Sequence, residues 1–183
     1  MYITRDTSKQ KVLLEQERRV FRTSDLALLW EVDNRNTLLT TIKRYTQREI
    51  LYSLQKGLYS TVPVNKLHIY EVGCAICGSW SYVSSETVLQ KEGVIFQNLE
   101  KITLLGKKSL EFEVGGTKYL CRYLGSNFLA NREGVLDDVK YSIATVDRAI
   151  ADTLHINPKY YFDNELAVEK SNWELIAKKV GYL

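Results

Sequence analysis

The segment TSDLALLWEVDNRNTLLTTIKRYTQREILYSLQKGLYSTV, residues 23–62, contains the patterns of two short helices, a tight turn and a two-stranded ribbon. Leu26, Leu29 and Trp30 stand at positions i, i+3 and i+4, which predicts a first helix with one apolar face. The pattern breaks at residues 32–34, where an Asp or an Asn can cap a second helix. This second helix carries most of the information about function.

The second predicted helix spans about residues 34–47. Leu38, Leu39, Ile42 and Tyr45 fall on one side of it and are expected to pack inward. At 3.6 residues per turn, polar residues occupy the opposite side, which should face solvent or a ligand.

The outer side of this helix has the composition of a DNA-reading surface. Residues 34–48 include four basic residues and no acidic residue. Asn, Gln and Arg can pair with purine edges in the major groove, while Lys, Arg and Thr can bind phosphate. The candidate DNA-binding residues on this helix are Asn34, Arg35, Asn36, Thr37, Thr40, Lys43, Arg44 and Gln47.

A β-hairpin is expected directly after this helix. The apolar and aromatic runs 50–54 and 58–62 are joined by Gln55, Lys56 and Gly57, a short loop with the Gly that hairpins favour. Helix, turn, helix and hairpin is the order of a winged helix-turn-helix, in which Gln55 and Lys56 at the hairpin tip would reach a neighbouring phosphate. The alternative is that the polar, basic helix side is simply solvated, or that the winged helix binds protein.

Basic charge is concentrated in the first third of the chain. The 183 residues are 45% hydrophobic and 26% charged, with a net charge of +3, values typical of a globular protein. Residues 1–66 contain 12 Lys and Arg against 7 Asp and Glu, whereas the other 117 residues contain 13 against 15. The excess of basic residues therefore lies in the segment that contains the predicted reading helix.

The sequence predicts a two-domain α+β protein. Pro63 is the expected boundary between a winged helix-turn-helix domain, residues 1–63, and a mixed C-terminal domain, residues 64–183. In the second domain, the runs 102–105, 110–114 and 117–123 predict a three-stranded antiparallel meander, with the Gly115-Gly116 pair as a hairpin turn. Capped helices are expected around it.

No catalytic or metal centre is expected. Cys74 and Cys77 form a CxxC motif that, with His68 and Cys121, has the residue types of a zinc site. However, the spacing to Cys121 is long, and both Cys of the motif lie on the apolar side of a predicted helix, so we interpret them as buried apolar residues. With no phosphate-binding loop and no nucleophile motif, we expect neither an enzyme nor a cofactor.

The sequence also predicts a cytoplasmic protein. No apolar run is long enough to cross a bilayer, and residues 1–11 lack the apolar region of a signal peptide. Three Cys cannot all pair within one chain, so reduced thiols are expected. No membrane partner is expected.

Three stretches resemble the AbiEi-type antitoxins, the predicted transcriptional regulators of phage-defence operons. LYSLQKGLYSTVP, residues 51–63, is similar to the wing of that family, and SYVSSETVLQKEGVI, residues 81–95, to its Tyr- and Ser-rich segment. SIATVDRAIADTL, residues 142–154, resembles the family's Ala-Ser/Thr-x-Glu-Arg/Lys-Ala-x-x-Asp helix. Asp147 stands where the family often has Glu, whereas Arg148, Ala149 and Asp152 fit. The resemblance covers about residues 20–160.

The resemblance implies an autorepressor of a type IV toxin–antitoxin system. Its partners would be double-stranded DNA of its own promoter and, functionally, a nucleotidyltransferase toxin with which no stable complex is expected. The alternatives are a solitary transcriptional regulator without a toxin, a winged-helix protein-interaction module, and a nucleic-acid enzyme with its site in the C-terminal domain. Salt-dependent duplex binding distinguishes the DNA-binding interpretations from the protein-interaction module.

Overall fold

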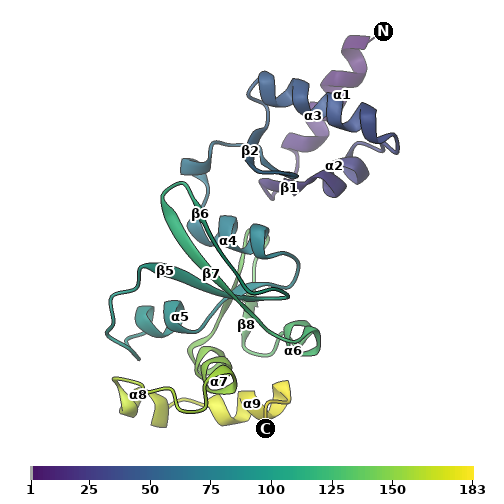
Figure 1. Ribbon diagram of the computed structural model, residues 1–183. Coiled ribbons are helices and arrows are strands. Elements are labelled where there is room, and N and C mark those ends of the chain that lie inside the picture. The colour runs from purple at the N-terminus through teal and green to yellow at the C-terminus, as the bar shows by residue number, and fades with distance from the viewer. Residues whose placement is uncertain (1) are drawn as a thin grey trace. The chain divides into compact units, whose positions relative to one another are not determined.

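The computed structural model describes the backbone of residues 2–183 and the side chains of residues 8–183 (Figure 1). Within this range the chain is an α+β protein with nine α-helices and two β-sheets. It divides into two compact units, one ending at Val72 and one spanning Gly73–Leu183. The division falls inside helix α4 (Ile69–Cys77), nine residues after Pro63. None of the helices in the described range has the length and apolar character that crossing a lipid bilayer requires.

The N-terminal unit contains three helices and a three-stranded antiparallel sheet. The sheet has the order β1-β3-β2, so the short strand at residues 20–22 pairs with the second strand of the hairpin. A single 3-10 turn, Val64–Lys66, follows the hairpin. The elements are α1 (Tyr2–Leu14), β1 (Val20–Arg22), α2 (Thr23–Leu29), α3 (Arg35–Gln47), β2 (Tyr52–Gln55) and β3 (Leu58–Ser60).

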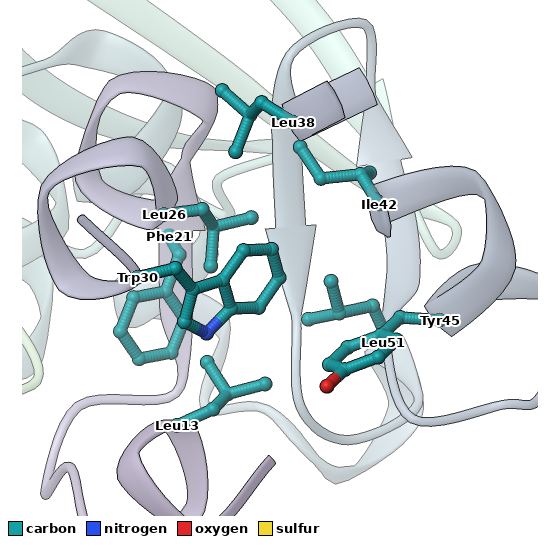
Figure 2. Close-up of a cluster of buried hydrophobic side chains, with 8 residues drawn as sticks. All are labelled: Leu13, Phe21, Leu26, Trp30, Leu38, Ile42, Tyr45 and Leu51. Carbon is teal, nitrogen blue, oxygen red and sulfur yellow. The ribbon is translucent and has the colours of Figure 1, made fainter. Parts of the chain in front are cut away.

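Eight buried apolar side chains form the core of this unit, and Figure 2 shows them converging from the three helices, from β1 and from the residue just before β2. The rings of Trp30 and Tyr45 meet edge to face, with centroids 5.2 Å apart, a favoured aromatic geometry. The Trp30 indole N–H is buried but paired, because it donates to the Lys9 carbonyl at 3.1 Å. The eight residues are Leu13, Phe21, Leu26, Trp30, Leu38, Ile42, Tyr45 and Leu51.

The expected inward position of Leu39 is wrong. Leu38, Ile42 and Tyr45 are buried as predicted, but Leu39 is 41% exposed, and Thr41 takes a buried position instead. Successive helical residues are 100° apart, so Leu39 is turned away from the direction that the other three share. Thr41 tolerates burial because its hydroxyl donates to the Thr37 carbonyl at 2.9 Å.

The C-terminal unit is built on a six-stranded mixed sheet of order β6-β7-β5-β4-β9-β8. The β5–β7 and β4–β9 pairs are parallel, and the other three pairs are antiparallel. The strands are β4 (Tyr82–Val83), β5 (Lys101–Gly106), β6 (Leu110–Val114), β7 (Thr117–Tyr123), β8 (Val135–Asp137) and β9 (Ser142–Ala144). The helices after α4 are α5 (Glu86–Lys91), α6 (Ser126–Ala130), α7 (Val146–Ile156), α8 (Glu165–Glu169) and α9 (Trp173–Val180).

The predicted antiparallel meander is wrong in its strand order. β6 and β7 form the expected hairpin, but β7 then pairs in parallel with β5 and lies between β5 and β6. β6 is an edge strand of the sheet, and charged residues such as Glu111 and Glu113 are typical of edge strands. β7 lies inside the sheet, and its Tyr119 and Cys121 are buried. The four residue steps from Gly106 to the start of β6 span up to about 13 Å, enough to cross two strand spacings.

Helices cover both faces of this sheet (Figure 1). On one face α4 approaches closely at Gly73, where an added Cβ would lie 3.0 Å from Leu104 and Tyr119 side-chain atoms. On the other face, Tyr82 of β4 reaches Asp152 of α7, and α7 packs against α5 and α9. The sheet is therefore the middle of three layers.

A fully buried ion pair lies between the sheet and the helices on the face that α7 covers. Arg148 Nε donates to Asp152 Oδ1 at 2.8 Å, and both side chains have no exposed surface. Asp152 also accepts from the hydroxyls of Ser84 at 2.7 Å, Tyr82 at 3.1 Å and Tyr182 at 2.6 Å. Burial raises the pKa of both Tyr82 and Tyr182, so these phenols remain protonated donors.

Arg148 also joins α7 to α6 and to the loop before β8. Its Nη1 donates to the carbonyls of Asn131 at 3.1 Å and Glu133 at 2.8 Å, and Nη2 donates to the carbonyl of Phe128 at 3.2 Å. A buried charge needs such partners to offset its lost hydration. The Arg and Asp that the family resemblance singled out are thus structural residues.

Ser85, which precedes α5, has a strained backbone conformation. This residue has φ +49° and ψ −133°, a conformation that residues other than Gly rarely adopt. Its side chain is fully buried, and its hydroxyl has no hydrogen-bond partner in the part of the chain whose side chains are described. Both features should destabilise the C-terminal unit.

We therefore expect Ser85→Gly to raise the free energy of unfolding by about 1 kcal/mol, because strain relief of roughly 1–3 kcal/mol exceeds the added freedom of the unfolded chain. The matched control is Ser84→Ala, which removes a paired hydroxyl and should lower stability by about 1–3 kcal/mol. Urea unfolding of both variants measures the difference. A less stable Ser85→Gly protein would show that the Ser85 conformation is not strained.

The three Cys thiols lie inside the C-terminal unit and form no disulfide. Burial raises the pKa of the Cys74 thiol to about 11. Two causes raise the pKa of the Cys77 thiol: mainly its hydrogen bond with Cys121, and also its burial. No group of three or more His, Cys, Asp or Glu in the described range has the geometry to hold a metal ion.

Because all three thiols are buried, a thiol reagent such as DTNB should reach them only very slowly in the folded protein at pH 8. All three thiols should react at once in denaturant. Rapid labelling of one equivalent in the folded state would show that a thiol is accessible, contrary to the burial described above.

Candidate nucleic-acid interface

The first turn of α3 is set by Asn34. Its side-chain Oδ1 accepts from the Thr37 amide at 3.0 Å and from the Thr37 hydroxyl at 3.3 Å, as an N-cap residue does. Of the two residues that were expected to be able to cap this helix, Asp33 and Asn34, Asn34 is the cap. These bonds also mean that Asn34 Oδ1 and the Thr37 hydroxyl are already paired, so Thr37 would meet phosphate only by exchanging that bond.

The outer side of α3 is exposed along its whole length. Arg35, Asn36, Thr40, Lys43 and Gln47 all have exposed side chains, while the opposite side is packed in the core. The acidic residues nearest in sequence, Asp33 and Glu49, stand beyond the two ends of the helix. This surface therefore presents amide, hydroxyl and cationic groups without a carboxylate among them.

Arg44 lies at the border of this surface. Its guanidinium carbon is 5.8 Å from the centroid of the Tyr45 ring, within the range of a cation–π contact. The Tyr45 ring is fully buried in the core. The side chain of Arg44 nevertheless stays exposed.

The hairpin tip is tethered to the start of α2. Gly57 adopts φ +80°, which Gly allows without strain. Its carbonyl accepts from the Thr23 amide at 3.0 Å and from the Thr23 hydroxyl at 3.4 Å. Gln55 and Lys56 are exposed beside this anchor. The sequence did not indicate the tether, because a backbone carbonyl that pairs 34 residues away leaves no local pattern.

All ten predicted contact residues are therefore on the surface of the N-terminal unit. Eight belong to α3 and its cap, and Gln55 and Lys56 belong to the hairpin tip. Their role in binding DNA stays a prediction.

Comparison of the sequence with protein-family models and with curated proteins gave no match. Amide and guanidinium groups offer paired donors and acceptors to base edges, and Lys43 offers a point charge to phosphate. A rigid helix that presents these groups on one side is suited to a groove of nucleic acid.

Proposed function

We propose that the N-terminal unit is a winged helix-turn-helix that binds double-stranded DNA sequence-specifically. The supporting observation is the acid-free, exposed side of α3, between residues 34 and 48, on a helix whose other side is packed in the core. The order α1, β1, α2, α3, β2, β3 is that of a winged helix, and the tip with Gln55 and Lys56 would be the wing. In this arrangement α3 enters the major groove.

The tether at Thr23 gives the wing a defined position relative to α2. A wing that is held in place can deliver Lys56 to a phosphate at smaller entropic cost than a mobile loop. Phosphate contacts fix register, and the α3 side chains would then meet base edges.

The proposed target is the promoter of the protein's own gene, and the proposed role is repression. This part of the proposal, and the antitoxin function with a nucleotidyltransferase toxin as its counterpart, depend on the resemblance of residues 51–63, 81–95 and 142–154 to AbiEi-type antitoxins. A solitary regulator would use the same DNA-binding surface without a toxin.

Fluorescence anisotropy with a duplex of the protein's own promoter, measured over a range of salt concentrations, tests the DNA-binding proposal. Lys and Arg that contact phosphate release counterions, so the logarithm of the affinity should fall linearly with the logarithm of salt. A shuffled duplex of equal composition should bind more weakly. Lys43→Ala should reduce the slope by about one.

Binding that is absent for every duplex upstream of the gene, or that does not respond to salt, would contradict the proposal. The result would then favour a winged helix that binds protein. Equal binding of the natural and the shuffled duplex would retain DNA binding but remove sequence specificity.

A further inference from the structure

Leu39 is an apolar residue on the side of α3 that otherwise carries the polar contact residues. It follows Asn36 by three residues and precedes Lys43 by four, and residues at these spacings are neighbours on a helix surface. All three side chains are exposed, and 41% of Leu39 is accessible. The structure thus places a branched apolar side chain between an amide and a cation.

Core packing does not account for a leucine at this position. Leu38 and Ile42 already fill the core side of α3, where they are 4% and 3% exposed. A single exposed leucine is common on protein surfaces. The position of this one is distinctive, because its neighbours Arg35, Asn36 and Lys43 are suited to a polyanion and no acidic residue lies between residues 34 and 48.

DNA offers one apolar group in the major groove, the C5-methyl group of thymine, and apolar side chains contact it there. The other bases present donors and acceptors that a leucine cannot use. An apolar group on a reading helix therefore favours thymine over the other bases.

We propose that Leu39 is a specificity-determining residue that packs against a thymine methyl group in the major groove. This inference rests on the proposed function of the N-terminal unit as a DNA-binding domain. Asn36 and Lys43 would meet groups on either side of that thymine. The recognised sequence therefore includes at least one thymine whose methyl group, and not only its hydrogen-bonding edge, contributes to affinity.

Replacement of single thymines by deoxyuridine in the duplex of the protein's own promoter tests this inference, because it removes only the methyl group. At one position for each bound copy, the affinity of the unchanged protein should fall about fourfold, the effect of one buried methyl-sized group of about 0.8 kcal/mol. Leu39→Ala should bind the thymine and the deoxyuridine duplexes equally. Thermal melts establish that this variant is folded.

Leu28→Ala is the matched control, because Leu28 is an 80% exposed leucine on α2 rather than on α3. This variant should keep the fourfold response to deoxyuridine. The affinities of the unchanged protein and of Leu39→Ala, each for the thymine and the deoxyuridine duplex, form a double-mutant cycle. This cycle isolates the contact between Leu39 and the methyl group.

Three results would overturn the assignment, and they are distinguishable. In the first, the protein binds the duplex with the expected salt dependence, but at every position deoxyuridine changes its affinity as it changes that of Leu39→Ala. The role of Leu39 is then wrong and DNA binding stands. If Leu39→Ala changes the sedimentation mass of the protein, Leu39 contacts a second copy of the chain instead. If no duplex binds, the proposed function and this inference fail together.

Discussion

A protein in which Lys43 and Arg44 are both replaced by Glu should lose binding to its own promoter duplex while its melting temperature stays nearly unchanged. Both residues have exposed side chains, Lys43 on the acid-free side of α3 and Arg44 at its border. Reversal places two carboxylates where the proposed interface meets phosphates, so attraction becomes repulsion. Surface substitutions of this kind usually change stability by less than about 0.5 kcal/mol.

Ile42→Ala is the matched control on the opposite side of the same helix. Ile42 is 3% exposed, so this truncation should lower the free energy of unfolding by about 2–5 kcal/mol. Thermal melts and anisotropy on both variants separate folding from binding. An early melt of the charge-reversed protein together with an unchanged Ile42→Ala protein would show that the sides of α3 are assigned the wrong way round.

The charge-reversed protein also separates the two proposed functions. If the resemblance to AbiEi-type antitoxins holds, the protein should still rescue cells from the cognate toxin when expressed from an independent promoter. Protein levels must be matched, because loss of autorepression changes dosage. Failure to rescue in a folded, equally abundant protein would mean that neutralisation depends on DNA binding.

Arg148→Met should destabilise the C-terminal unit by about 3–5 kcal/mol, since it leaves a buried Asp152 without its counter-charge. Three hydroxyls would still donate to Asp152. However, the carbonyls of residues 128, 131 and 133 would lose the guanidinium that they share. Urea unfolding measures the loss.

Lys179→Ala is the control for this prediction. Lys179 forms a 2.6 Å ion pair with Glu133 in the same unit, but the two side chains are 50% and 41% exposed. Exposed pairs contribute roughly 0–1 kcal/mol, so the control should unfold almost like the unchanged protein. If Arg148→Met behaved like Lys179→Ala, the buried network would not be what stabilises this unit.

Local patterns allowed much of the N-terminal unit to be predicted. The spacing of Leu38, Ile42 and Tyr45 correctly indicated the buried side of α3, and Asn34, one of the two alternative capping residues, is its cap. Both depend on residues within one or two helical turns. Leu39 was misplaced because a residue about 100° from the centre of an apolar side can face either the core or solvent. The packing of neighbouring elements decides between the two.

Long-range pairings could not be predicted in the same way. The parallel pairing of β7 with β5 depends on which strand the sheet buries, and the hairpin signal at residues 115 and 116 says nothing about it. The four-residue spacing of Arg148 and Asp152 is common in surface ion pairs. Only the three-dimensional structure shows that this pair is fully buried and joined to Tyr82 and Tyr182.

NMR tests the proposed DNA interface most directly, when the backbone amide signals of the labelled protein are followed as its own promoter duplex is added. We expect the largest shifts on residues 34–48 and on Gln55 and Lys56, with small changes in the segment from Gly73 to Leu183. Shifts that are largest in the C-terminal unit, or that are absent at every duplex concentration, would contradict the proposal that the α3 side and the hairpin tip bind DNA.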